Sequence, residues 1–163
     1  MNDRIVALNE QLSLNTRLFL TSLEGVDDAV ARRRPGEKTN NNNMVFIALH
    51  LVDARSFLAR YVGLDFQHPF KDLEDVASIE EMEERFPDID EVRDVWRELS
   101  GRLAARFVDL TDKELLAPSE QDFPVDDGSV LGGIAFLLGH EAFHVGQLAF
   151  LRKYFGLEPM AYD

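Results

Sequence analysis

The chain has 163 residues, 45% of them hydrophobic, which is enough to bury the core of a single domain spanning residues 1–163. It has no cysteine, so disulfides, thiolate metal ligands and cysteine nucleophiles are excluded, and any metal must be held by nitrogen and oxygen atoms. The net charge of −13 argues against nucleic acid as a partner, because an acidic surface repels phosphate backbones. Neither a membrane-spanning apolar run nor a signal peptide is recognisable, so we expect a cytoplasmic protein with no membrane partner.

Two long amphipathic helices are predicted in the first half of the chain. In residues 3–23 apolar side chains recur at helical spacing, and Gly25 follows as a stop signal. A second helix is predicted over residues 44–62, because the asparagines at 40–43 precede an apolar run and asparagine is a preferred helix N-cap. His50 falls in the middle of the apolar face of this helix.

The second half of the chain predicts two more long helices after a long connection. Residues 64–86 show only a weak pattern, with a short helix expected to start at Ser78 and to stop at Pro87. A third long helix is predicted over residues 89–110. Residues 111–128 are acidic and broken by prolines, which is typical of a loop, and a fourth long helix is predicted over 129–155.

These elements predict an all-α fold, a four-helix bundle with a long connection between helices two and three. That connection permits a crossover in place of strict up-and-down order. Glycines inside the fourth helix each cost about 0.5–1 kcal/mol relative to alanine. We therefore expect the backbone of a neighbouring segment to approach closely at these positions, which are Gly132, Gly133, Gly139 and Gly146.

Three histidines on apolar helix faces predict a metal site. His140 and His144 lie one turn apart on the fourth helix, about 40° from each other around its axis, and His50 lies on the second. Buried imidazoles without partners would leave nitrogens unsatisfied at about 1–3 kcal/mol each, whereas one divalent cation satisfies a nitrogen on every ring. We predict that these three residues hold a metal with water in the open positions, as in catalytic sites. Ordinary core histidines are the alternative.

The sequence leaves open whether four further side chains take part in this site. Gln147 shares the face of His140 and could orient a ring or bind a metal-bound water. Asp53, one turn after His50, is a candidate acceptor for an imidazole N–H, or else a solvated acid. His68 precedes a proline and is expected at the surface. Glu141 could act as a base near the metal.

The segment His140-Glu141-Ala142-Phe143-His144 also matches H-E-x-x-H, the helix of zinc proteases in which the glutamate is the general base. That class needs a third ligand downstream. The long form requires a histidine at position 150, where this chain has Phe150, and the other form requires a glutamate on a later helix, where only Glu158 remains. A protease of this type is therefore not expected.

The histidine pattern resembles the DinB/YfiT-like superfamily. The resemblance rests on a lone His50 in the second helix, followed ninety residues later by H-x-x-x-H-x-G-Q at residues 140–147, and on the Asn-rich entry into Ala48-Leu49-His50. It covers most of the chain. It implies a four-helix bundle, a nickel, zinc or iron ion held by His50, His140 and His144, and a frequent homodimer. Characterised relatives include thiol-transferases and thiol-dependent isomerases, and other members have no known reaction.

The expected function is a metal-dependent enzyme of the DinB-like family with a small-molecule substrate. Thiol-transferase or thiol-dependent detoxification chemistry comes first, with a low-molecular-weight thiol as the candidate co-substrate. A metal-dependent hydrolase of small molecules is one alternative. A non-catalytic helical bundle that binds metal or dimerises is the other. Catalytic residues beyond the metal vary in the superfamily, so none is assigned.

Overall fold

A computed structural model describes residues 2–36, 41–73 and 79–162, and four long helices make up most of this part of the chain. In these ranges there is no strand, and one isolated β-bridge joins two loop positions. The all-α prediction is confirmed, and each long helix begins and ends within three residues of its predicted bounds. The long helices are α1 (Val6–Ser22), α3 (Met44–Tyr61), α5 (Ile89–Asp109) and α7 (Val130–Tyr154).

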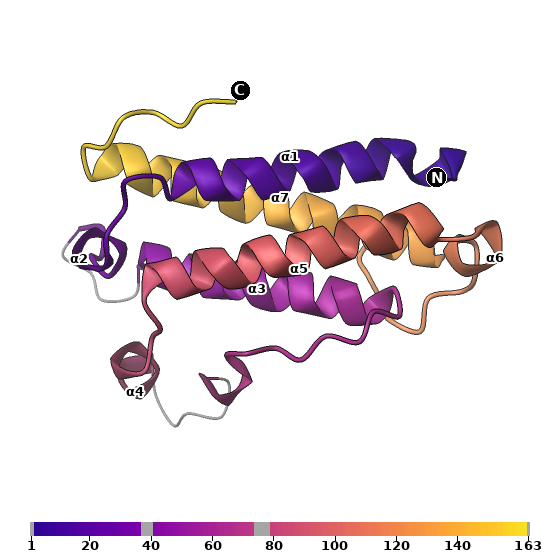
Figure 1. The fold of residues 1–163 in the computed structure, drawn as a ribbon, viewed down its shortest axis with the longest axis horizontal. Coiled ribbons are helices and arrows are strands. Elements are labelled where there is room, and N and C mark those ends of the chain that lie inside the picture. The colour runs from indigo at the N-terminus through magenta and orange to yellow at the C-terminus, as the bar shows by residue number, and fades with distance from the viewer. Residues whose placement is uncertain (1, 37–40, 74–78, 163) are drawn as a thin grey trace.

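The long helices lie side by side, and α7 packs against both α1 and α3, while α5 packs against the same two helices (Figure 1). α3 and α5 run in the same direction. The described parts of the connection, residues 62–73 and 79–88, therefore return along the length of the helices before α5 begins (Figure 1). This is the long crossover connection that the sequence permits, and it leaves α3 and α7 as neighbours in space although they are far apart in the sequence.

Caps explain why the observed helix bounds agree with the predicted ones. The Asn43 side chain accepts a hydrogen bond (2.9 Å) from the backbone N–H three residues later, so the last of the asparagines caps α3. Ser129 does the same for α7, at 3.3 Å. At the other ends, Gly63 and Gly156 adopt φ values of +80° and +81°, the left-handed conformation that glycine tolerates best after a helix.

Shorter helices occupy the connections, and two of them refine the predictions. The chain starts with a 3-10 turn and not with α-helix, and residues 111–128 contain a helical turn that the sequence analysis did not predict. The short helix before α5 ends ahead of a proline as expected, while its predicted start at Ser78 lies outside the described residues. These elements are η1 (Asp3–Ile5), α2 (Asp28–Ala31), η2 (Lys71–Leu73), α4 (Ile79–Glu84) and α6 (Asp112–Leu115).

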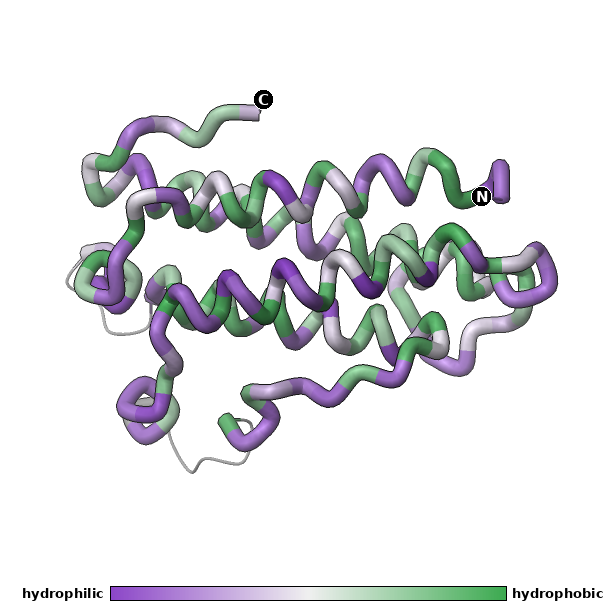
Figure 2. Tube along the Cα trace, viewed as in Figure 1, coloured by the Kyte–Doolittle hydropathy of each residue, from purple (hydrophilic) through white to green (hydrophobic). Residues whose placement is uncertain are grey.

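The apolar faces of the long helices meet in a core centred on Trp96. Hydrophobic and hydrophilic positions alternate along the long helices, as amphipathic helices require (Figure 2). Trp96 of α5 is fully buried, and its indole stacks on the Phe19 ring of α1 with the ring centroids 4.1 Å apart. The indole N–H donates to the carbonyl of Thr16 at 3.2 Å, so the polar end of this large side chain is also satisfied.

α7 is unusual among the long helices because it is apolar all round. By length and composition alone it could cross a membrane. The core helix of a soluble protein can have the same length and composition, and α7 packs against α1 and α3 as a core helix does. Its exposed face carries Phe143 and Phe150, which are 64% and 63% exposed.

The glycines of α7 divide into two pairs. A Cβ atom at Gly132 would lie 2.8 Å from the Asp127 Cβ, and one at Gly133 would lie 2.6 Å from an aromatic ring of the preceding loop. At Gly132 the close atoms include the backbone of Asp127, so the predicted approach of a neighbouring backbone is confirmed there. At Gly133 the close atoms belong to side chains, so the space is tight but the prediction of a backbone contact is wrong. At Gly139 and Gly146 no described atom lies within 4 Å of the added carbon, so the prediction is wrong there.

Candidate metal centre

The structure brings His50 of α3 together with His140 and His144 of α7. The Nε2 atom of His140 lies 3.2 Å from Nε2 of His50 and 3.1 Å from Nε2 of His144. One ligand atom from each ring lies within 4.8 Å of the others. The pair on α7 converges because the two residues are one helical turn apart, and His50 joins them because α3 and α7 are adjacent.

Gln147 contacts the His144 ring at the nitrogen that does not face the other histidines. Its side-chain oxygen lies 2.7 Å from Nδ1 of His144, and since an amide oxygen can only accept, Nδ1 carries the proton. The Nε2 atom of His144 is then unprotonated, and its lone pair faces the other two rings. Of the two roles that the sequence left open for Gln147, this contact matches the orientation of a ring.

Burial favours the neutral form of His50 and of His140. Desolvation lowers the pKa of His50 below its ordinary value of 6.5, and the neighbouring His144 lowers it further, against a smaller opposite effect of Asp53. Desolvation also lowers the pKa of His140, with His144 and His50 adding to the effect. Neutral imidazole is the form that binds metals.

The three rings fit a divalent metal ion better than they fit one another. Nε2 of His140 has either one proton or one lone pair, so it cannot make a good hydrogen bond with both of its neighbours. Zinc–nitrogen bonds of about 2.0–2.1 Å in a tetrahedral site place ligand nitrogens roughly 3.3 Å apart, close to the contacts of His140. A set of three imidazoles suits zinc, nickel, copper or iron.

Glu141 does not face this cluster. Its carboxylate is buried in the core and accepts two hydrogen bonds from Arg55 of α3, at 2.8 Å from Nε and 2.5 Å from Nη2. Asn15 of α1 donates to the same carboxylate at 3.1 Å. A carboxylate engaged in this way joins α7 to α3 and α1, and it is not placed to act as a base at the histidines.

Arg55 is a site residue that sequence reasoning missed. Its guanidinium is fully buried, donates to Ser100 of α5 at 2.6 Å and lies over the Trp96 ring, 3.5 Å from the centroid. The available signal was a lone arginine on the apolar face of α3, matched by a lone glutamate, Glu141, on apolar α7. Two opposite charges on faces predicted to be buried indicate an internal ion pair.

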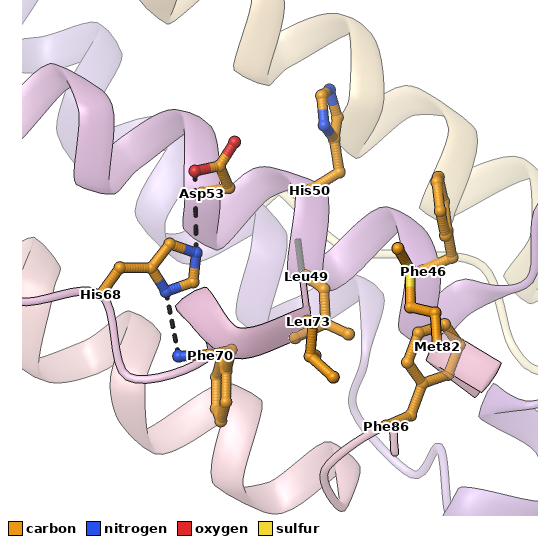
Figure 3. Close-up of a pocket in the computed structure, with 9 residues that line it drawn as sticks. All are labelled: Phe46, Leu49, His50, Asp53, His68, Phe70, Leu73, Met82 and Phe86. Carbon is orange, nitrogen blue, oxygen red and sulfur yellow. Dashed lines mark hydrogen bonds and ion pairs between the residues drawn. The ribbon is translucent and has the colours of Figure 1, made fainter. Parts of the chain in front are cut away.

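Asp53 and His68 form a second group beside His50. The sequence left Asp53 open as an acceptor for a ligand imidazole or as a solvated acid, and its carboxylate lies 3.7 Å from Nε2 of His68. The His68 side chain is only 6% exposed, so its prediction as a surface histidine is wrong. The residue after Pro69 donates its backbone N–H to Nδ1 of His68 at 3.1 Å, which turns this ring toward α3 (Figure 3).

Comparison with known families agrees with this arrangement. The family model of the DinB superfamily matches residues 11–148, a range that contains all three histidines of the cluster. No curated protein matches the chain. Because the matched range covers most of the sequence and the fold is helical throughout the described residues, the resemblance noted in the histidine pattern is confirmed. The chain belongs to the DinB superfamily.

Proposed function

We propose that this protein is a metal-dependent enzyme acting on small molecules, with one divalent ion held by His50, His140 and His144. The observation that carries the proposal is the convergence of three Nε2 atoms, with the His140 contacts at 3.1 and 3.2 Å. The ion would be zinc, nickel or iron. Three neutral protein ligands leave coordination positions for water or substrate, which is the arrangement of catalytic sites and not of closed structural ones.

The protein's own residues prepare the site in two ways. Gln147 fixes the tautomer of His144, so that the lone pair of Nε2 points into the cluster. Burial lowers the pKa values of His50 and His140 and so favours the neutral, ligating forms at neutral pH. A bound divalent ion would act as a Lewis acid, lowering the pKa of a coordinated thiol or water or polarising an electrophile.

Thiol transfer, or a thiol-dependent detoxification, is the reaction class that we propose. Membership of the DinB superfamily supports it, because the resemblance implies thiol-transferases among the relatives. A low-molecular-weight thiol would be the co-substrate, since the chain has no cysteine of its own to supply a sulfur nucleophile. We further propose a cytoplasmic homodimer, in keeping with the family and with the exposed phenylalanines of α7.

Metal content tests the ligand set. Protein purified without an affinity tag should contain about one divalent ion per chain, measured by elemental analysis, because the three rings form one site. His144→Ala should abolish stoichiometric uptake. His68→Ala is the matched control, since it removes a histidine outside the cluster, and it should retain the ion. Full uptake by His144→Ala would overturn the proposed site.

Product formation tests the reaction. Metal-loaded protein should join low-molecular-weight thiols to small electrophiles in a panel followed by mass spectrometry, and the His144→Ala variant should be inactive in the same assay. Hydrolysis of an ester or amide panel with no thiol product would instead indicate the hydrolase alternative. A protein that binds one ion and is inactive in both panels would favour the binding bundle.

A further inference from the structure

A cavity of about 150 Å³ lies beside the histidine cluster, between α3 and the crossover connection (Figure 3). His50 belongs to both, because its Nε2 atom faces His140 while its side chain also lines the cavity. The remaining wall comes from α3, from the segment around η2 and from the end of α4. The lining residues are Phe46, Leu49, His50, Asp53, His68, Phe70, Leu73, Met82 and Phe86.

One end of the cavity is apolar. The side chains of Phe46, Leu49, Leu73, Met82 and Phe86 line it, and Figure 3 shows them gathered on the side away from Asp53. A dry cavity of about this volume is known to accommodate a six-membered aromatic ring. Methionine and phenylalanine walls adapt readily to flat or branched apolar groups. This end therefore fits an apolar body with about six heavy atoms.

The other end carries the carboxylate of Asp53, which lies beside the His68 ring. The backbone N–H of Phe70 donates to Nδ1 of His68, so Nδ1 has no proton and the neutral ring carries its proton on Nε2. Nε2 faces Asp53 Oδ1 at 3.7 Å. The Asp53 side chain remains 44% exposed and so can also contact a ligand. Asp53 is therefore the charged group at this end that meets the ligand.

The charge around the cavity has the same sign as Asp53. Residues 62–88, the connection that supplies this wall, carry two basic and nine acidic side chains. A negative potential attracts cations and repels anions of the same size. The combination of an apolar floor, the Asp53 carboxylate and an acidic connection therefore selects for an amine and against a carboxylate.

We propose that this cavity is the substrate subsite of the metal centre and that it takes a small apolar amine, with an aromatic or branched aliphatic body on the floor and an ammonium group at Asp53. The proposal rests on the proposed function for its connection to the metal. His50 lines the cavity and also belongs to the proposed ligand set, so a ligand bound in the cavity would lie next to the ion. The substrate with the apolar body would therefore bind on the side of α3 that faces the crossover connection.

Binding of three small probes tests the chemistry of the cavity. Benzylammonium, benzyl alcohol and benzoate share a ring and differ in charge, and each would be titrated into the full-length protein and followed by NMR. Benzylammonium should bind roughly five- to tenfold more tightly than benzoate, since an exposed ion pair contributes little and like charge adds repulsion. Equal binding of the three probes, or tighter binding of benzoate, would overturn the amine assignment.

Matched variants locate the binding. Asp53→Asn should remove the preference for benzylammonium over benzyl alcohol while the ring still binds. Leu49→Trp should fill the floor and weaken all three probes about tenfold or more, whereas Leu116→Trp, the same change at a leucine that is 51% exposed, should leave binding unchanged. If Leu49→Trp binds the probes as the wild type does, the ring sits elsewhere and the proposal fails.

A paramagnetic ion separates this inference from the proposed function. With Co²⁺ added, the ring protons of benzylammonium should relax faster on wild-type protein than on His144→Ala, whose cavity is intact because His144 does not line it. Stoichiometric Co²⁺ uptake without faster relaxation would overturn the subsite and leave the metal site standing. Absence of Co²⁺ uptake with selective benzylammonium binding would overturn the metal site, and with it the cavity's assignment as a subsite, but not the amine preference.

Discussion

Glu141 follows His140 directly in the sequence, yet the two side chains serve different parts of the molecule. His140 faces α3 and the other histidines, whereas the Glu141 carboxylate lies in the core with Arg55 and Asn15. Successive residues of a helix point about 100° apart, so this division is built into α7. The motif that resembles a protease helix thus contains two metal-ligand candidates and one structural acid.

Replacing Glu141 by glutamine should destabilise the protein by about 3–5 kcal/mol, because it leaves the Arg55 guanidinium buried without its counter-charge. The measurement is urea unfolding followed by circular dichroism. Asp94→Asn removes one partner of the exposed Arg97–Asp94 pair and should cost less than about 1 kcal/mol. Equal stability of Glu141→Gln and the wild type would show that the core pair is not important for the fold.

Gln147→Leu should weaken metal binding by about 10- to 100-fold, because the His144 ring loses the acceptor that fixes its tautomer. Competition with a chromogenic chelator would measure the affinity. Gln147→Glu keeps an acceptor at the same place and should restore tight binding. Loss of affinity in both variants would mean that the side chain acts through its shape and not through this hydrogen bond.

At the scale of single residues, the sequence predicted which side chains lie on which helix face, because this follows from helical periodicity. The three histidines fell on helix faces with known phase, so their convergence followed once α3 and α7 were neighbours. The tautomer of His144 and the pairing of Asp53 with His68 could not be predicted. Both depend on rotamers and on the path of a connection that has no periodic pattern, and no spacing rule supplies these.

At the scale of elements, Gly132 and Gly139 give a matched pair of substitutions in one helix. Gly132→Ala should destabilise the protein because its Cβ would press on Asp127, including backbone atoms that cannot move aside cheaply. Gly139→Ala should stabilise it by about 0.5–1 kcal/mol, since the site is exposed and alanine is the better helix former. Thermal unfolding of both variants checks the signs, and stabilisation by both would contradict the close contact.

The short helix α6 should make stability depend on pH through Glu114. Hydrogen bonds from Thr111 and Arg106 lower the pKa of this carboxyl from 4.5 to about 2. A lowered folded-state pKa contributes stability that is fully present above pH 4.5 and lost as the pH falls toward 2. The difference in unfolding free energy between wild type and Glu114→Gln should therefore shrink across that window. A constant difference would contradict the assignment.

Among the elements, the long helices were predictable and α6 was not. Apolar periodicity and caps such as Asn43 and Ser129 predict the long helices. α6 spans only Asp112–Leu115, too short to show a period, and it depends on a capping box between Thr111 and Glu114. Proline and acidic residues around it gave the stronger, misleading signal for a loop.

At the scale of the whole molecule, the exposed aromatic face of α7 bears on the proposed homodimer. Phe143 and Phe150 lie seven residues apart, on the same side of the helix, and Tyr154 continues their line with 53% exposure. Phe150→Ser should shift the protein toward monomer in light scattering at matched concentration, since an apolar anchor is lost. Tyr162→Ser, at an aromatic residue outside α7 that is 71% exposed, serves as the control. A wild-type monomer would refute the dimer.

The overall arrangement was predictable in outline. Four amphipathic stretches and one long connection indicated a helical fold with a possible crossover, and the structure has both. The cavity beside His50 was not predictable, because it forms where η2 and α4 return along α3, and sequence patterns do not specify how a connection packs. The substrate side of the candidate site therefore depends on the least regular part of the chain.

The position of the histidines on α3 and α7 has a consequence for how fast the protein is degraded in a cell. On the proposed ligand set, one ion would tie together positions that are ninety residues apart in the sequence. A ligand that binds only the folded chain stabilises it by RT ln(1 + [L]/Kd), about 2.7 kcal/mol at one hundred times Kd. Metal supply would then govern turnover, because scarcity raises the unfolded fraction on which proteases act. The abundance of the protein would report the metal status of its cell.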